Sequence, residues 1–452
     1  MRGSTGWALS LLLASGGGCS LWIDTEPDCD AVRDCGGHLC NAERTGCEST
    51  CDGDLECVEG FACDTGSRGC VRVVRLLGDP VRLEPLASRA SEIASAADAD
   101  GVSVASGGPL GLTFARFAST GERLATPGDV APTGALLLAP PSPTGQLFDP
   151  SVSIRPGGRA SVAWVEEGGG RSKLQVASFD GTWNLLPVAT ARDANQQTSL
   201  SDVQARFAAE GGLALWREQS GSQVSLQAIA LDAETFAPLG VQPTRLTAVN
   251  ESAEFGQLGR VGDTWLAVAA VTQGGSRTVR AHRVGPTGEL AGRLDLRPLA
   301  PTSSFEVVDA AFGAEGSTGL AAWSEARAGR RVVVVAAIDA ATAARIGSNA
   351  QASTPVEITG ELNEASRLTV AFSGAEAAVA WFEVTAAGDR RIAVRRIDAA
   401  GQPLSPVGAA VEGLDRPASS VRLSSTGDGY VLNWTLLGDD GLELWSRRLG
   451  RP

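Results

Sequence analysis

One short segment recurs through most of this chain with a period of about 50 residues. Its copies read SVAWVEE, LALWREQ, VAAVTQG, LAAWSEA, AVAWFEV and VLNWTLL, anchored at Trp164, Trp216, Ala270, Trp323, Trp381 and Trp434. The anchors are 52, 54, 53, 58 and 53 residues apart, and one more step of 58 back reaches Ser106 in the weaker copy GVSVASG. Such a period in a glycine-rich chain without a helical pattern predicts seven similar β units.

Each unit contains four strand-like runs, in which β-branched or aromatic residues alternate with small or polar ones. In the sixth unit these runs are residues 367–373, 377–383 and 390–397 and a short run from Gln402. Four strands make one blade of a β-propeller, so we predict an all-β propeller with seven blades, six or eight being alternatives. An open array of β units or two β-sandwiches would also fit the period.

The two ends of the repeated region complement each other. The last unit stops after its third run, residues 442–449, so its fourth strand is missing. Residues 78–84 (GDPVRLE) read like a fourth run, such as residues 401–404 of the sixth unit. We predict that this N-terminal segment supplies the outer strand of the last blade, because closing the ring in this way removes an exposed sheet edge.

The repeated tryptophan predicts how the blades hold together. Val162, Trp164 and Glu166 are two residues apart and therefore share one face of a strand. A tryptophan on this strand of most blades would fill the wedge between neighbours and bury roughly 150–250 Å². Glutamates recur two places after the tryptophan, at Glu166, Glu218, Glu325 and Glu383. Their recurrence favours a structural role over an acidic catalytic ring, since an active site would break the symmetry.

The N-terminus has the pattern of an export signal. Met1 and Arg2 precede an apolar run, residues 7–14, that is too short to span a bilayer, and small residues lead from it to Cys19. We predict a signal peptide over residues 1–18 and a linker over residues 19–28. The stretch that ends at Cys19 resembles the lipobox of bacterial lipoproteins, although Gly16 stands where leucine is usual. This resemblance implies a lipidated Cys19; the alternative is ordinary cleavage, with Cys19 in a disulfide.

All nine cysteines lie in the first 70 residues. Without Cys19 they form two sets of four at similar spacing: Cys29, Cys35, Cys40 and Cys47, then Cys51, Cys57, Cys63 and Cys70. An even number at repeated spacing in an exported chain predicts a disulfide-bonded module, here residues 29–70, followed by the propeller over residues 71–452. Each set allows three pairings; we favour first to third and second to fourth, because interleaved bridges hold a short unit most tightly.

Metal binding is the competing interpretation of these cysteines. A zinc site would need closely paired cysteines, whereas the nearest approach is Cys47 to Cys51, and His38 is interpreted as a surface residue. We therefore predict no metal site and no cofactor, with calcium left open. Carboxylate pairs occur at residues 28 and 30, 52 and 54, and 98 and 100, but a calcium loop offers more ligands, so solvated acidic surface explains them better.

The cysteine-rich segment is also the acidic part of the chain. Residues 20–70 contain twelve carboxylates and three arginines, a net charge of −9 out of −14 for the whole chain. Such a surface repels nucleic acid and anionic lipid, so we expect neither as a partner. Contact with a membrane is expected only through the lipid anchor.

A search for catalytic motifs leads us to predict no catalytic residue. Histidine occurs only at His38 and His282, and His282 lies inside the strand-like run TVRAHRV. The chain has no G-x-S-x-G, no H-E-x-x-H and no phosphate-binding glycine loop. Residues 178–183 are a distorted version of the aspartate box of sialidase-like propellers. Residues 98–101 (DADG) have fewer carboxylates than the calcium loops of integrin-like propellers.

Two resemblances indicate one group of proteins. Residues 51–70 (CDGDLECVEGFACDTGSRGC) resemble the cysteine-rich repeats of surface lipoproteins from myxobacteria and related bacteria, and Lys173 as the only lysine fits such a source. Residues 79–449 lack the WD and kelch signatures and resemble the loosely defined propeller repeats of exported proteins from the same bacteria. These resemblances imply a lipid-anchored protein of the outer membrane or cell surface with a binding or scaffold role.

Two functions remain open. The first is a non-catalytic propeller that binds a protein, peptide or glycan. The second is a glycan-active hydrolase or lyase that uses carboxylates in the central funnel. An asymmetric cluster of aspartate, arginine and aromatic residues at the axis would favour the enzyme, and a symmetric or apolar axis would favour the binding protein.

Overall fold

The computed structural model describes residues 38, 50–51, 57–64, 67–83, 92–108, 111–118, 120, 122–124, 136–140, 145–155, 158–180, 183–297, 305–348, 353–439 and 441–451. Cys19, Cys29, Cys35, Cys40 and Cys47 lie outside these ranges, as do the predicted signal peptide, the linker and the carboxylates at residues 28, 30, 52 and 54.

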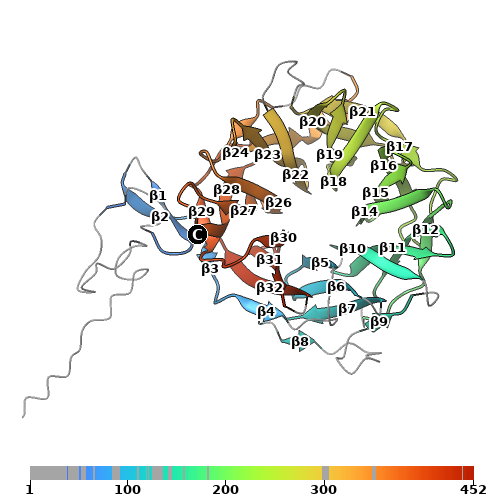
Figure 1. Ribbon diagram of the computed structural model, residues 1–452, viewed down its shortest axis with the longest axis horizontal. Coiled ribbons are helices and arrows are strands. Elements are labelled where there is room, and N and C mark those ends of the chain that lie inside the picture. The colour runs from blue at the N-terminus through green and yellow to red at the C-terminus, as the bar shows by residue number, and fades with distance from the viewer. Residues whose placement is uncertain are drawn as a thin grey trace, which may run out of the picture.

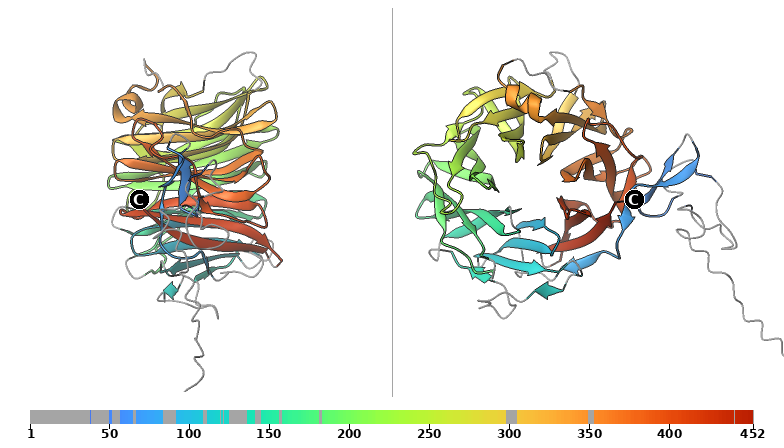
Figure 2. Two further views of the ribbon diagram at one scale, coloured as in Figure 1. Left: turned by 90° about the vertical axis from the view of Figure 1, so that its left-hand side faces the viewer. Right: turned by 180° about the vertical axis from the view of Figure 1, so that it is seen from behind.

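Seven antiparallel sheets stand around a central axis, which confirms the predicted all-β propeller with seven blades (Figure 1). Edge-on, the blades form one disc, with the innermost strands side by side around the axis (Figure 2). Among the described residues the helical content is one short helix, α1 (Ala340–Arg345). No helix in this part of the chain is long and apolar enough to cross a membrane.

Each of the first six blades starts at its innermost strand and runs outward along the chain. Blade 1 contains β5 (Glu92–Ala97), β6 (Val102–Gly108), β7 (Gly111–Phe117) and β8 (Arg123–Leu124), and β9 (Leu136–Leu138) also pairs with β7. Blade 2 contains β10 (Gln146–Ile154), β11 (Ala160–Gly168), β12 (Arg171–Ser178) and β13 (Ala189–Ala194). Blade 3 contains β14 (Thr198–Ala208), β15 (Gly211–Ser220), β16 (Gln223–Leu231) and β17 (Thr244–Arg245).

The next three blades repeat this order. Blade 4 contains β18 (Glu251–Val261), β19 (Thr264–Gln273), β20 (Ser276–Val284) and β21 (Leu290–Asp295). Blade 5 contains β22 (Phe305–Glu315), β23 (Thr318–Arg327), β24 (Arg330–Asp339) and β25 (Val356–Glu357). Blade 6 contains β26 (Glu364–Ser373), β27 (Glu376–Val384), β28 (Arg390–Asp398) and β29 (Gly408–Val411).

The fourth strand of blade 6 is the one element that the sequence analysis misplaced in this unit. The predicted run from Gln402 follows a turn, in which the Asp398 carboxylate accepts the N–H groups of Ala400 at 2.9 Å and Gln402 at 2.7 Å. This run pairs with β28 at the single bridge between Pro403 and Ile397. The outer strand β29 begins six residues later, at Gly408. Asp398 holds the local backbone in the turn, so strand pairing resumes only after it.

The last blade combines both ends of the described chain. Its inner strands are β30 (Ala418–Ser425), β31 (Gly429–Gly438) and β32 (Gly441–Gly450). The outer edge of β32 pairs with β3 (Arg75–Leu76) and β4 (Val81–Leu83), with Leu83 opposite Leu444. The segment that the sequence analysis assigned to this outer strand, residues 78–84, contains β4. The ring is therefore joined by hydrogen bonds between the start and the end of the propeller.

Seven separate apolar cores fill the wedges between neighbouring blades. The anchor tryptophans lie on the second strand of their blades and are at most 2% exposed: Trp164, Trp216, Trp323, Trp381 and Trp434. Trp216 packs with Val165 and Leu174 of blade 2, and Trp323 packs with Leu266 of blade 4. Each ring therefore fills the wedge towards the preceding blade.

Blade 4 corrects one anchor position. Ala270 packs in the wedge towards blade 5, whereas its neighbour Ala269 packs towards blade 3, as the tryptophans of other blades do towards theirs. Because side chains alternate along a strand, a shift of one residue changes the face. The segment LAVAAV has no large residue to mark its register, and Leu213, Leu215 and half-buried Trp265 fill this wedge instead.

We expect Trp323→Ala to destabilise the propeller by about 3–5 kcal/mol, because it removes a fully buried ring and leaves a cavity that rigid neighbouring sheets cannot close. Trp323→Phe is the matched control and should cost less, since it keeps part of the ring. Chemical denaturation of the two variants measures the difference. Equal loss in both would show that the ring volume does not hold the wedge.

The second set of cysteines forms a small hairpin on the outside of blades 6 and 7. Strands β1 (Phe61–Asp64) and β2 (Gly69–Arg72) pair with each other, and disulfides join Cys51 to Cys63 and Cys57 to Cys70. This is the interleaved first-to-third and second-to-fourth pattern. Disulfides of this kind are typical of a chain that folds in an oxidising compartment.

The hairpin has a small core of its own around its disulfides, and with the two residues that follow it also packs into the propeller. Ala62, Val73 and Val74 are buried in the same apolar cluster as Trp434 and Ile392. The predicted boundary at residue 70 falls inside β2, so it does not separate two independent cores.

The backbone of Gly60 connects the hairpin both to the outer strand of blade 6 and to the segment that follows the hairpin. The N–H of Gly60 donates to the carbonyl of Ala409 at 3.0 Å, and the carbonyl of Gly60 accepts from Val73 at 2.8 Å. Gly60 has a φ of +83°, and a side chain there would lie 2.7 Å from the Val74 carbonyl. A glycine is therefore required for this close approach.

Arg447 joins three segments that are far apart in the sequence. Its Nη1 donates to Glu59 at 2.7 Å and to the carbonyl of Ala410 at 2.8 Å, and its Nε donates to the carbonyl of Gly78 at 3.1 Å. The side chain is only 5% exposed, so these three acceptors satisfy a buried charge. The hairpin, blade 6 and the closing segment are thus held at one point.

We expect Glu59→Gln to lower the stability of the whole propeller by about 1–2 kcal/mol, because the buried Arg447 loses its only carboxylate partner among the described residues. Asp193→Asn, which breaks the exposed Arg171–Asp193 pair, is the control and should change stability by less than about 0.5 kcal/mol. Thermal unfolding followed by tryptophan fluorescence tests this. An unchanged melting temperature for Glu59→Gln would mean that the hairpin does not support ring closure.

Candidate functional site

The main cavity among the described residues is a channel along the propeller axis, with a volume of about 1170 Å³. The innermost strands of all seven blades line it. Figure 1 shows these strands face-on around the axis. Because each blade contributes the same strand, differences between blades at equivalent positions determine the chemistry of the channel.

A β-bulge or similar irregularity interrupts the innermost strand of six blades, β10, β14, β18, β22, β26 and β30, near the start of the strand. In blades 2, 3 and 6 the extra residues lie directly opposite the anchor tryptophan. Three residues there adopt positive φ without being glycine: Asp149 (54°), Asp202 (50°) and Arg367 (58°). Bulges leave backbone N–H groups without a partner in the ladder, and these groups need other acceptors.

Side chains of the neighbouring blade supply these acceptors. Glu92 of blade 1 accepts the N–H of Asp149, and Asp309 of blade 5 accepts the N–H of Leu368 at 3.0 Å.

One amide side chain and one hydroxyl side chain connect further blades in the same way. Gln204 of blade 3 accepts from Leu258 at 3.1 Å and donates to the carbonyl of Gly256 at 2.7 Å. Thr369 of blade 6 accepts from Leu423 at 3.0 Å. Such bonds therefore connect blade 1 to blade 2, blade 3 to blade 4, blade 5 to blade 6 and blade 6 to blade 7 beside the channel.

Asp149 is the most perturbed carboxyl group in the channel. Burial raises its pKa to about 7, and the charges of Asp202 and Glu92 act in the same direction. The N–H groups of Asp202 and Val203 lower this pKa, but not enough to offset the burial. Its Oδ2 is buried and has no hydrogen-bond partner among the described residues. At neutral pH this carboxyl group is therefore partly protonated.

Five arginines in the described part of the chain line the channel. Arg260 pairs with Glu210 and Asp263, and Arg155 donates to the carbonyl of Ala233. The other three are Arg206 of blade 3, Arg367 of blade 6 and Arg422 of blade 7.

Burial and, to a smaller extent, the charge of Arg422 together lower the pKa of Arg206 to about 10. The surrounding protein also lowers the pKa of Arg422, although water in the channel reaches its side chain. The charge of Asp309 raises this pKa, and the charge of Arg367 lowers it. The channel is therefore strongly charged and asymmetric.

This asymmetry matches one half of the pattern that would favour an enzyme. Aspartates and arginines are present at the axis. Of the aromatic residues that line the channel, Phe207, Phe312 and Phe372 are at most 8% exposed and belong to wedge cores, while Trp265 is half-buried. Asp309 and Glu92 also accept backbone N–H groups of the next blade. The axial carboxylates thus have a structural task in this ring.

The four repeated glutamates lie elsewhere and bind their own blades. The tryptophan Nε1 donates to the glutamate two residues later in three of them: Trp216 to Glu218 at 3.2 Å, Trp323 to Glu325 at 2.8 Å and Trp381 to Glu383 at 2.6 Å. An arginine pairs with each of these carboxylates. In blade 2, Glu166 binds Lys173 and Gln175, and Trp164 Nε1 has no partner. None of the four glutamates lines the channel.

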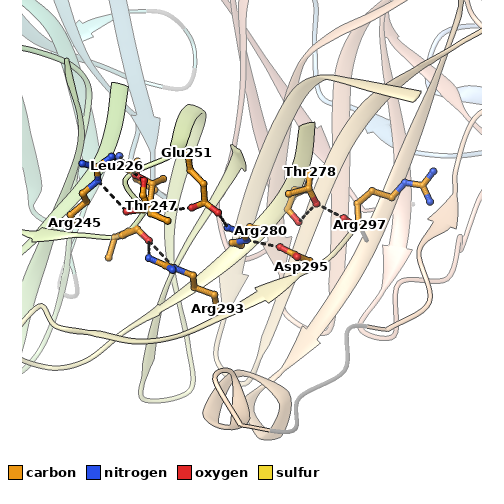
Figure 3. A network of polar contacts seen from close by, with 12 residues as sticks. Leu226, Arg245, Thr247, Glu251, Thr278, Arg280, Arg293, Asp295 and Arg297 are labelled. Carbon is orange, nitrogen blue, oxygen red and sulfur yellow. Dashed lines mark hydrogen bonds and ion pairs between the residues drawn. The ribbon is translucent and has the colours of Figure 1, made fainter. Parts of the chain in front are cut away.

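A further network of charges connects blade 3 to blade 4 (Figure 3). Arg280 lies between Glu251 and Asp295, with a nitrogen–oxygen distance of 2.5 Å to each. Glu251 also accepts the N–H of Ala248 at 2.7 Å, and Arg293 donates to the carbonyl of Leu246 at 2.7 and 2.9 Å. Glu251 and Asp295 at the centre of this network both pair with Arg280. Charges paired in this way stabilise the fold and are not available to a ligand.

Both histidines lie inside the structure rather than at a reactive surface. His282 is on β20 and fully buried; burial and the charges of Arg280 and Arg293 lower its pKa to about 3, so it is neutral at physiological pH. His38 is half-buried and accepts the N–H of Cys70 at 3.2 Å.

The metal-site candidates have other roles in the described residues. The sulfurs of Cys51, Cys57 and Cys70 lie close together, but each is in a disulfide and none is a thiolate ligand. Asp98 accepts the N–H groups of Asp100 and Gly101 and pairs with Arg116 at 2.7 Å. Residues 98–101 therefore form a turn that the ion pair between Asp98 and Arg116 stabilises.

The axial residues were missed by sequence reasoning, although the repeat contains their position. Asp202, Asp309 and Arg367 each lie 14 residues before an anchor tryptophan. Their chemical identity changes from blade to blade, so they do not appear as a conserved repeat feature. Aligning the units on tryptophan and asking where charge varies would have found them.

The comparisons with known proteins support the fold and leave the activity open. No protein-family model matches the sequence, and no curated protein matches it. Among solved structures the chain is similar to the polysaccharide lyase Uly1, with 9% identity, a TM-score of 0.50 and coverage of 81% of this chain and 91% of that one. It is also similar to the GH43 endo-arabinanase from Bacillus licheniformis (10%, TM-score 0.37, coverage 72% and 99%) and the Dos1 propeller (10%, 0.44, 84% and 96%). Such neighbours include enzymes and other propellers, so this likeness shows the fold alone.

We expect Asp149→Asn to stabilise the protein at pH 8 and to have little effect near pH 4. The folded protein holds the Asp149 proton up to about pH 7, whereas the unfolded chain loses it near the ordinary value of 3.8, so stability falls as the pH rises through this window. Asparagine removes that penalty and tolerates positive φ, for a gain on the order of 1–2 kcal/mol in a channel that water reaches. Thermal unfolding from pH 4 to 8 measures it. Asp100→Asn, in an exposed turn, is the control, and parallel curves for both variants would contradict the assignment.

Proposed function

We propose that this protein is a non-catalytic, exported lipoprotein whose propeller binds a ligand at the cell surface. The lipid on Cys19 holds it to the outer membrane, the disulfide-linked segment connects the anchor to the propeller, and the channel receives the ligand. The ligand is a glycan, a peptide or part of a protein.

The observation that carries this proposal is the axial channel itself. It has a volume of about 1170 Å³, within or slightly above the range of ordinary ligand sites, and polar side chains from several blades converge in it. Its aspartates and Glu92 help to hold the bulges of neighbouring blades, which leaves the arginines and the hydroxyl groups to contact a ligand. Such a site can bind and orient a molecule without taking part in chemistry.

A glycan-active hydrolase or lyase is the second candidate, and Asp149 is the observation on its side. A carboxyl group with a pKa of about 7 can act as a general acid or base at physiological pH. However, the N–H groups of Asp202 and Val203 face this carboxyl group, so it lies in the seam between two blades. The appearance of new reducing ends on incubation with a polysaccharide panel, abolished by Asp149→Asn, would favour the enzyme.

A binding array tests the proposal directly. The full chain with Cys19→Ser, exported without its lipid, is applied to arrays of glycans and secreted proteins. We expect a ligand whose binding is lost in Ser419→Trp, which places a ring in the channel, and is kept in Glu361→Trp on the exposed surface. Binding that both variants keep would place the ligand outside the channel and contradict the proposal.

The anchor makes a separate prediction. The wild-type protein should partition into detergent and incorporate labelled palmitate, and Cys19→Ser should abolish both. Retained labelling in the variant would show that Cys19 is not the lipidated residue.

A further inference from the structure

Among the described residues, four arginines that line the axial channel have no carboxylate partner. Arg155 donates to the carbonyl of Ala233 and lies over the rings of Phe207 and Phe236. The other three are Arg206, Arg367 and Arg422.

In the part of the chain that the structure describes, no side chain accepts a hydrogen bond from Arg206, Arg367 or Arg422. Arg422 donates only to the carbonyl of Val421, at 3.3 Å. The arginines of the wedge and rim networks, in contrast, bind carboxylates at 2.5–3.2 Å, as Arg280, Arg391 and Arg192 do.

The three positive charges act on one another although they come from different blades. The charge of Arg422 lowers the pKa of Arg206, and that of Arg367 lowers the pKa of Arg422. Arg367 and Arg422 are exposed to the water of the channel and Arg206 is half-buried, so an anion in the channel can reach all three and would relieve their repulsion. Arg367 also has a φ of +58°, a conformation that costs energy for a long side chain and is often kept at functional sites.

The neighbouring carboxylates do not supply that anion. Asp309 accepts the N–H groups of Leu368 at 3.0 Å and Ala310 at 2.8 Å. Asp202 pairs with Arg217 on the adjacent strand. Asp149 is partly protonated at neutral pH because its pKa is about 7. Among the described residues, none of these carboxylates is hydrogen-bonded to the three guanidinium groups, although Asp309 and Asp202 lie close enough to act on the charge of Arg422.

We propose that Arg206, Arg367 and Arg422 bind the carboxylate of an acidic saccharide inside the axial channel. The planar guanidinium fork matches a carboxylate with two parallel hydrogen bonds. This inference rests on the proposed binding function and specifies the class of ligand.

The rest of the channel lining favours a saccharide over an acidic peptide. Ser151, Gln257, Ser419 and Ser424 line the channel with hydroxyl and amide groups, which can both donate and accept, as sugar hydroxyls do. A peptide would also bury apolar side chains, but Phe207 and the other channel phenylalanines are packed into wedge cores. The surface available to the ligand is thus mainly polar.

Titration calorimetry with tri-galacturonic acid and its methyl ester tests the charge requirement. The protein is the full chain with Cys19→Ser. We expect the acid to bind at least about tenfold more tightly than the ester, which has the same size and no charge. Arg206→Gln and Arg422→Gln should each weaken binding of the acid about tenfold, equivalent to about 1.4 kcal/mol. Arg345→Gln, on the exposed surface of α1, is the matched control and should bind normally.

Thermal unfolding separates a ligand-binding role from a structural one. Arg206→Gln should not lower the melting temperature, because it relieves repulsion from Arg422 and breaks no hydrogen bond that the structure records. A marked destabilisation by this variant would show that Arg206 is structural and would overturn the proposal.

The remaining outcomes distinguish this inference from the proposed function. Equal binding of acid and ester, or equal loss in Arg206→Gln and Arg345→Gln, would overturn the arginine site, while an array ligand that Ser419→Trp excludes would keep the channel as a binding site. Binding of tetraglutamate that depends on Arg206, without binding of tri-galacturonic acid, would replace the saccharide by an acidic peptide. An array ligand that Ser419→Trp does not affect would instead contradict the proposed function.

Discussion

Packing between neighbouring blades is the constraint on which this structure depends. Each four-stranded sheet has two apolar faces. One face packs against the preceding blade and the other against the following blade. The anchor tryptophans fill five of the seven wedges, while leucines, phenylalanine and smaller apolar residues fill the other two. Since every wedge core belongs to two blades, no blade is stable alone, and the ring is complete only when the last wedge has formed.

Ring closure extends this dependence to the N-terminal segment. The outer strand of blade 7 comes from residues 81–83, and the disulfide-linked hairpin packs on blades 6 and 7 just before it. Arg447 connects the hairpin, blade 6 and the closing segment through three hydrogen bonds. The cysteine spacing in the sequence predicts a separate module. In the structure its hairpin packs on blades 6 and 7 and helps to hold the strand that closes the ring.

The propeller architecture also explains why charged side chains without an ion-pair partner among the described residues lie at the axis. In the wedge and rim networks, glutamates pair with tryptophan N–H groups and arginines, so their charges are used within the fold. At the axis the bulges in the innermost strands turn individual residues towards the channel, and their side chains need not match those of other blades. The asymmetric aspartates and arginines lie there because this is the one place where the repeat does not dictate side-chain chemistry.

The sequence by itself determined the all-β fold, the seven units and the second-strand tryptophans, because a regular period requires each unit to bury the same face. It also indicated the segment that closes the ring, since an unpaired edge at one end matched a spare strand at the other. Only the tertiary structure decided that Ala269 rather than Ala270 faces blade 3, and that the hairpin packs into a core of the propeller. It alone brought Arg206, Arg367 and Arg422 together, because residues up to 216 positions apart meet only when the ring closes around the axis.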